Sequence, residues 1–115
     1  MIWYDDLFVG ESISSRKKEK IIRRVRTRSL FHNAYLLTLS SNPDNLIDII
    51  STKVIRQRYY PKKGLYVIGI AGDYEEAVML AGTIIGGVYA TRGDFGLREF
   101  IRDNRHNSRE EGQLC

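Results

Sequence analysis

Residues 67–77 read VIGIAGDYEEA, and this stretch decides the fold because it joins a strand, a glycine turn and the start of a helix. The strand part belongs to the run LYVIGIA, which is apolar throughout, as in a strand buried on both faces. Asp73 stands where a helix cap is needed, and Glu76 follows three residues later, which is the spacing of a capping box. We therefore predict a helix that continues to about Thr91 and is closed by Gly93.

Folds that bind nucleotides often open with the same three parts, so a phosphate site has to be weighed here. A dinucleotide fingerprint needs the spacing G-x-G-x-x-G, whereas this stretch holds only Gly69, inside the strand, and Gly72. A P-loop needs Gly-Lys-Ser or Gly-Lys-Thr, and the chain has neither. Three carboxylates, at Asp73, Glu75 and Glu76, would repel a phosphate from the helix start. The residues favour helix capping over anion binding.

A second strand and helix are predicted upstream. Residues 34–40, AYLLTLS, form another apolar run that is typical of a buried strand. Asn42 suits the cap of a following helix, and Pro43 suits its first position. The apolar residues within 46–57 then support a helix to the end of that segment.

Together these segments predict an α/β fold in the order (β)-α-β-α-β-α-α. A basic helix is expected over residues 13–29 and a short one from Asp94, whereas residues 3–9 fit either an edge strand or the lead-in to a helix. Strands joined by a helix pair in parallel, so we expect a small two- or three-stranded, mostly parallel sheet with flanking helices. One domain is expected over residues 1–103, followed by a polar, flexible tail over 104–115.

A parallel sheet would bring the carboxyl ends of both predicted strands to one edge, where open α/β sheets bind ligands. The residues at that expected edge are Ser40, Ser41, Asn42, Gly72 and Asp73. Helix capping explains the same residues, and we favour it over a ligand site.

Composition narrows the function classes. The chain has 115 residues, of which 43% are hydrophobic and 28% charged, which is typical of a soluble globular domain. Its single cysteine, Cys115, allows no disulfide within the chain, and no apolar run is long enough to span a bilayer. We expect a cytoplasmic protein that does not insert into membranes.

Residues with catalytic or metal-binding patterns are scarce. His32 and His106 stand alone in the sequence, and no serine lies in a nucleophile elbow. We therefore expect no catalytic residues, no metal and no cofactor, and enzymatic activity is the less favoured class.

Charge is divided unevenly along the chain. Residues 1–63 hold thirteen Lys/Arg and six Asp/Glu, whereas residues 64–115 hold five and eight, giving net charges of +7 and −3. Basic residues next to aromatics can follow a nucleic-acid backbone, although the chain has no known reader motif. Attraction between the two halves explains the charges equally well. The predicted patch comprises Arg16, Lys17, Lys18, Lys20, Arg23, Arg24, Arg26, Arg28, Arg56, Arg58, Tyr59, Tyr60, Lys62 and Lys63.

Glycines inside the last long helix indicate an interface. Gly82, Gly86 and Gly87 fall within six residues, and each costs a helix about 1 kcal/mol relative to alanine. Gly82 and Gly86 project to one side, next to Tyr89, where close packing of another helix would explain them. The packing helix is expected either from the same chain or from a second copy. The short sheet adds to this expectation, because another chain or the N-terminal segment has to cover its edge.

These observations favour a small cytoplasmic α/β protein without catalytic machinery that self-associates or binds a protein partner. The alternative is an accessory protein that binds nucleic acid through residues 16–28 and 53–63. A third class, a small-ligand sensor or enzyme, would use the predicted sheet edge.

Overall fold

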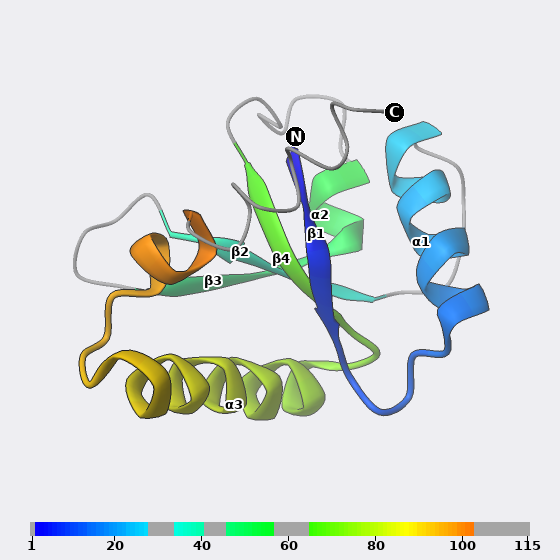
Figure 1. The fold of residues 1–115 in the computed structure, drawn as a ribbon. Coiled ribbons are helices and arrows are strands. Elements are labelled where there is room, and N and C mark those ends of the chain that lie inside the picture. The colour runs from blue at the N-terminus through cyan, green and yellow to red at the C-terminus, as the bar shows by residue number, and fades with distance from the viewer. Residues whose placement is uncertain (1, 28–33, 41–45, 57–64, 103–115) are drawn as a thin grey trace.

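The computed structural model describes residues 2–27, 34–40, 46–56 and 65–102, and the predicted tail over 104–115 lies outside them. The described chain has mixed α and β content, with a four-stranded sheet and helices on both of its faces (Figure 1). A short helical segment at residues 97–102 follows the last element. The elements are β1 (Ile2–Val9), α1 (Ser15–Thr27), β2 (Tyr35–Leu39), β3 (Ile47–Ser51), α2 (Thr52–Arg56), β4 (Tyr66–Ala71) and α3 (Tyr74–Arg92).

The sheet is mixed, with the strand order β1-β4-β2-β3. β1 runs parallel to β4, with Trp3 beside Val67, whereas β2 runs antiparallel to both β4 and β3. Leu37 of β2 therefore lies between Gly69 on one side and Ile49 on the other. The expectation of a two- or three-stranded, mostly parallel sheet was wrong in both the number and the direction of strands.

The difference comes from residues 47–51, IDIIS, which form β3 rather than the first part of a helix. Isoleucine is β-branched and packs well on a pleated sheet, and every residue of β2 has a partner in β3. A short connection between paired strands makes a hairpin, which is antiparallel. Only α2 remains of the predicted helix over 46–57, and its expected start at Asn42 and Pro43 lies outside the described residues.

Residues 2–9 form the edge strand β1, which answers the question that the sequence left open. The sheet edge was expected to be covered either by another chain or by the N-terminal segment. The N-terminal segment covers it on one side of β4. The register of this parallel pair shifts between Trp3 and Phe8, so the strand bends along its length.

Two apolar cores lie on opposite faces of the sheet. Leu36 and Ile70 point to the side covered by α1 and α2, where they pack with Val25. Leu37 and Ile68 point to the other side, where their cluster includes residues from α3 and the 97–102 segment. All four of these strand residues are fully buried. The architecture is therefore three layers, with α3 below the sheet in Figure 1 and α1 and α2 across from it.

The predicted ends of α3 are confirmed, and α1 begins at a serine cap. The Ser14 hydroxyl accepts a hydrogen bond from the Lys17 amide at 3.1 Å, so Ser14 caps α1. Asp73 caps α3, and Gly93 closes that helix with a φ of 80° while its amide donates to the Tyr89 carbonyl. A positive φ is the conformation that favours glycine at this position.

Candidate functional site

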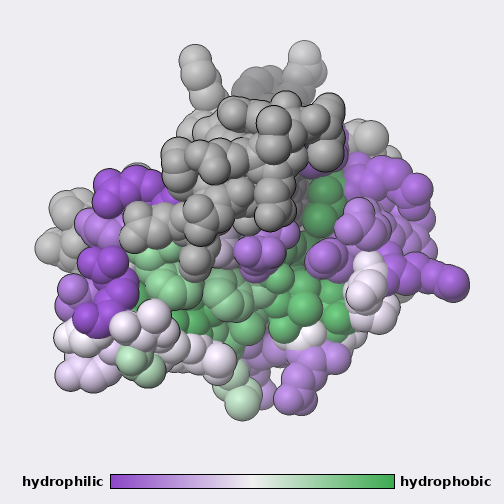
Figure 2. Space-filling model, viewed as in Figure 1, coloured by the Kyte–Doolittle hydropathy of each residue, from purple (hydrophilic) through white to green (hydrophobic). Residues whose placement is uncertain are grey.

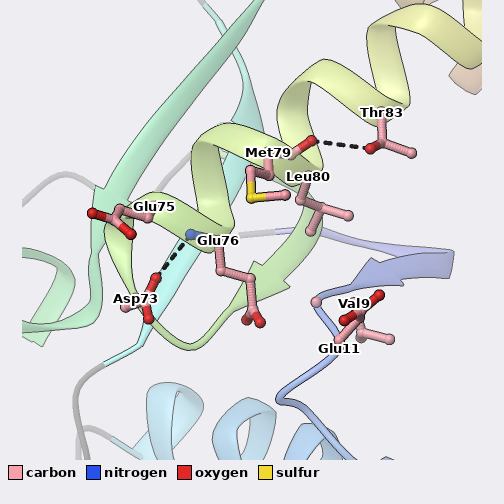
Figure 3. Close-up of a pocket in the computed structure, with 9 residues that line it drawn as sticks. Val9, Glu11, Asp73, Glu75, Glu76, Met79, Leu80 and Thr83 are labelled. Carbon is pink, nitrogen blue, oxygen red and sulfur yellow. Dashed lines mark hydrogen bonds between the residues drawn. The ribbon is translucent and has the colours of Figure 1, made fainter.

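The start of α3 is held by the carboxylate of Glu76. Its Oε1 accepts hydrogen bonds from the Gly72 amide at 2.6 Å and from the Ser12 hydroxyl at 2.7 Å, and its Oε2 accepts from the Ser12 amide at 3.1 Å. Asp73 Oδ1 in turn accepts from the Glu76 amide at 2.8 Å, as Figure 3 shows. Glu76 thereby fastens the segment after β1 to the turn between β4 and α3.

Two glycines leave space for this carboxylate. A Cβ at Gly10 would overlap the carboxyl group of Glu76, and a Cβ at Gly72 would overlap the Ser12 hydroxyl. In the predicted capping box Glu76 would have bonded the Asp73 amide, but it bonds one residue earlier and reaches across to Ser12 instead. The chain's own carboxylate binds the Gly72 amide, which an anion approaching this turn would otherwise use.

These contacts set the charge state of Glu76. The hydrogen bond from the Gly72 amide is the main cause that lowers the pKa of Glu76 below its ordinary value of 4.5. Desolvation opposes it, while the two Ser12 hydrogen bonds and the positive charge of Lys17 lower the pKa further. The group is therefore ionised at neutral pH, which is the state that accepts all three hydrogen bonds.

A hollow of about 460 Å³ lies beside this link, between the first turns of α3 and the end of β1 (Figure 3). One part of its lining is apolar, from Val9, Met79 and Leu80, and the other part is acidic. The acidic lining would repel a phosphate. Within the described ranges no three His, Cys, Asp or Glu side chains are grouped to hold a metal ion. The acidic residues of the lining are Glu11, Asp73, Glu75 and Glu76.

The predicted ligand edge is divided between two ends of the sheet. Because β2 and β4 are antiparallel, Tyr35 pairs with Ala71 at one end, whereas Thr38 pairs with Val67 towards the other. Ser40 follows β2 and Gly72 follows β4, so they do not meet, and the expected common edge was wrong for these strands. The Ser40 carbonyl accepts a hydrogen bond from the Arg98 guanidinium, and Ser41 and Asn42 lie outside the described residues.

The glycines of α3 lie on its outward side. A Cβ built at Gly82, Gly86 or Gly87 would meet no described atom within 4 Å. The other side of the helix is in the core, where Ala77, Ile84 and Val88 are buried. No described helix of this chain packs against the three glycines.

Large apolar side chains surround those glycines. Val78 is 47% exposed, Met79 74% and Tyr89 51%, and Phe95 just past the helix is 56% exposed. The Tyr89 and Phe95 rings stack with centroids 4.9 Å apart. Residues 77–91 include no charged side chain. In Figure 2 the lower edge of the molecule, where α3 runs, accordingly carries white and green rather than continuous purple.

The basic residues of α1 lie opposite, across the sheet. Ile21 and Val25 anchor the helix in the core, and the side at the right of Figure 2, where α1 runs, is purple. Arg56 ends α2, which packs on the same face. The remaining predicted patch residues, Arg28, Arg58, Tyr59, Tyr60, Lys62 and Lys63, lie outside the described residues. The described α1 residues of the patch are Arg16, Lys17, Lys18, Lys20, Arg23, Arg24 and Arg26.

Sequence reasoning selected the α3 glycines but missed the apolar side chains around them. The missed residues are Val78, Met79 and Phe95, and the signal that marks the first two was present, because they begin a long uncharged stretch within a helix. The link between Ser12 and Glu76 was also missed, and it has no local signal since 64 residues separate the two.

Comparison with known proteins gives no relative: no protein-family model, no curated protein and no solved structure matches this chain. Among the described helices, none has both the length and the apolar character needed to cross a bilayer.

Proposed function

We propose that this chain is a small protein-interaction module, which self-associates or binds another protein through the outward side of α3. The observation that carries the proposal is that α3 is apolar on both sides. A helix on the surface of a soluble domain normally shows water a charged or polar face. Here the outward side presents Val78, Met79 and Tyr89 around open glycines. Exposed apolar surface of this kind marks interaction sites.

The cost of exposure supports the same proposal. Removing apolar surface from water yields roughly 25 cal/mol per Å². Met79 and Tyr89 hold more than half of their surface in water, so they gain that stabilisation only when a second molecule covers them. Tyrosine is also among the residues that dominate binding energy in protein interfaces. The expected cytoplasmic location remains part of this proposal and rests on the single cysteine.

Photo-crosslinking in cells tests the module. A photo-reactive residue replaces Met79 in one variant and Glu19, an exposed residue of α1, in a control. We expect a covalent protein adduct of defined mass from position 79 and none from position 19. Equal labelling at both positions, or none at position 79, would rule out α3 as the binding face.

A second function, binding of nucleic acid through α1, is favoured by one specific observation. The sequence allowed the basic residues to be neutralised by the acidic half, yet Arg16 and Lys20 form no ion pair with any described carboxylate. The ion pair that the described residues show, Arg92 with Asp94 at 2.9 Å, lies within the acidic half itself. Glu19 is the only acidic residue among seven basic ones on α1.

Salt dependence tests this second function. Affinity for a short DNA or RNA should fall steeply with salt, because phosphate contacts release counterions. Lys20→Glu should weaken binding and reduce the salt slope, whereas Arg102→Glu, the same charge change elsewhere on the molecule, should leave the slope unchanged. No binding of either nucleic acid at low salt would remove this function.

A further inference from the structure

We propose that the molecule covering the outward side of α3 is a second copy of this chain, with the two α3 helices antiparallel about a two-fold axis between Gly82 and Gly86. This inference rests on the proposed function and specifies the partner. It follows from the order of residues along the helix, the charges at its ends and the shape of the open face.

The open face reads almost the same in both directions. At 3.6 residues per turn, Val78, Gly82, Gly86 and Tyr89 fall within about 80° of the helix circumference. Large side chains therefore lie at both ends of the face and glycines in the middle. When such a helix is turned end to end against its copy, Gly82 lies opposite the second copy's Gly86, and Met79 lies opposite its Tyr89. A two-fold interface requires this kind of self-complementarity.

The glycines let the two backbones approach closely. Helices usually pack with axes 8–10 Å apart, a separation set by the side chains between them. Small residues four apart on one face allow a closer approach, at which the flanking side chains reach the opposite helix. Nothing within the described chain uses the open space at Gly82 and Gly86, whereas a second copy fills it.

The large residues then find suitable neighbours. Met79 is 74% exposed, and its thioether lies opposite the second copy's Tyr89, whose ring is backed by Phe95 at 4.9 Å. Thioether sulfur packs favourably against aromatic rings. Each copy contributes this contact once, so the interface contains it twice.

Charge at the helix ends selects the antiparallel arrangement. The first turn of α3 carries Glu75 and Glu76, and the last turn carries Arg92. An antiparallel pair brings the acidic first turn of one helix beside the basic last turn of the other, at both ends of the interface. A parallel pair would oppose the acidic turns to each other. Arg92 also holds Asp94 at 2.9 Å, which fixes its guanidinium at this end of the helix.

The C-terminal tail is a weaker candidate for this face than a second copy. Residues 104–115, NRHNSREEGQLC, have Leu114 as their one large aliphatic residue. A segment of that composition has too little apolar surface to cover Val78, Met79 and Tyr89. A second copy brings a matching apolar face of the same extent.

A matched pair of glycine variants tests the interface. Gly86→Leu places a side chain at the centre of the face, whereas Gly87→Leu places the same side chain about 100° away on the same helix. No described atom crowds either position and both changes favour helix formation, so neither is expected to unfold the chain. In analytical ultracentrifugation the parent chain and Gly87→Leu should dimerise alike. Gly86→Leu should weaken dimerisation by about tenfold or more, each tenfold being 1.4 kcal/mol.

A charge exchange tests the antiparallel direction. Glu75→Arg alone and Arg92→Glu alone each place like charges together at both ends of the dimer, and each should weaken it. The double variant restores opposite charges and should recover the parent affinity to within about threefold. Circular dichroism of every variant checks that the helix remains folded.

The outcomes separate this inference from the proposed function. If the parent chain stays monomeric at all concentrations while position 79 still crosslinks to another protein, the proposed homodimer is wrong. The proposed protein-interaction function of α3 then still holds. A dimer that tolerates Gly86→Leu, or a double charge variant that is no tighter than the single ones, overturns the antiparallel α3 interface. A monomer with no crosslink at position 79 overturns both.

Discussion

Helices α1 and α3 cover opposite faces of the same sheet, and they differ in what they show to solvent. Both have a buried side: Val25 of α1 and Val88 of α3 are each 1% exposed. The outward side of α1 is strongly basic, whereas the outward side of α3 is uncharged between its first and last turns. Packing on the sheet explains the inner sides, but it places no demand on the outer ones. The residues on the solvent-facing sides of α1 and α3 are therefore the ones that can indicate a function.

The largest expected effect concerns the buried sides of α1 and α3, and it tests whether both helices contribute to the stability of the fold. Ile84→Ala in α3 should lower the free energy of unfolding by about 3 kcal/mol, because it leaves a cavity in a packed core. Val25→Ala in α1 should lower it by about 2 kcal/mol, since fewer atoms are removed. Urea denaturation measures both. If either helix is undocked from the sheet in solution, its variant will cost less than about 0.5 kcal/mol.

The next effect concerns the carboxylate that joins β1 to α3. Glu76→Ala should cost about 2 kcal/mol of unfolding free energy at neutral pH, because three hydrogen bonds lose their acceptor. The lowered pKa of Glu76 means that its ionised form is favoured by folding. Its contribution is present above the ordinary value of 4.5 and is lost as pH falls through the lowered one.

A pH series of denaturation curves therefore checks the sign. The difference in stability between the parent and Glu76→Ala should shrink as pH falls below about 4.5. Glu75→Ala is the control, because Glu75 is an exposed carboxylate in the same helical turn. A difference that is constant across this range would mean that Glu76 acts through packing rather than charge.

A smaller effect compares two glycines of α3. Gly82→Ala and Gly87→Ala should each stabilise the isolated chain by up to about 1 kcal/mol, because alanine favours the helix and neither position is crowded. At high protein concentration, Gly82→Ala should stabilise the protein less than Gly87→Ala does, because the alanine at position 82 also disturbs the self-association face. Thermal unfolding across a concentration series gives both values. If both variants raise the stability equally at every protein concentration, Gly82 does not lie in a self-association interface.

The smallest expected effect lies on α1. Lys20→Ala should change the free energy of unfolding by less than about 0.5 kcal/mol, as for most exposed side chains. It should nevertheless reduce the salt slope of nucleic-acid binding by about one. A loss of stability larger than this would mean that the charge on α1 serves the fold.

Local patterns predicted β2, β4, α1 and α3 because each carries its signal within its own residues. The Asp73 and Gly93 caps, for example, lie next to the helix that they close. β3 was mistaken for a helix because Ile47, Ile50 and Val54 recur at intervals of three and four residues, which is also the spacing of a helix face. What makes it a strand is pairing with β2, and a contact between separate segments leaves no periodicity to read. The predicted ligand edge was wrong for the same reason, since its residues were grouped on the assumption that the strands are parallel.

The candidate surfaces were predictable in part for the same reason. The glycines of α3 and the basic residues of α1 stand out in the sequence, but their exposure depends on where the sheet lies. Ser12 and Glu76 show the limit most clearly, because they meet only after β1 and β4 have paired.

The parallel pairing of β1 with β4 has a consequence for the order of folding during synthesis. Ile2 pairs with Tyr66, so β1 is joined by a partner that the ribosome makes more than half of the 115 residues later. The β2–β3 hairpin has its partners close in sequence and is free to form first. Because β4 lies between β1 and β2, we expect the sheet to be completed only when β4 has been made. Until that moment the apolar faces of all three waiting strands are open, and this interval is when chaperones would have most to protect.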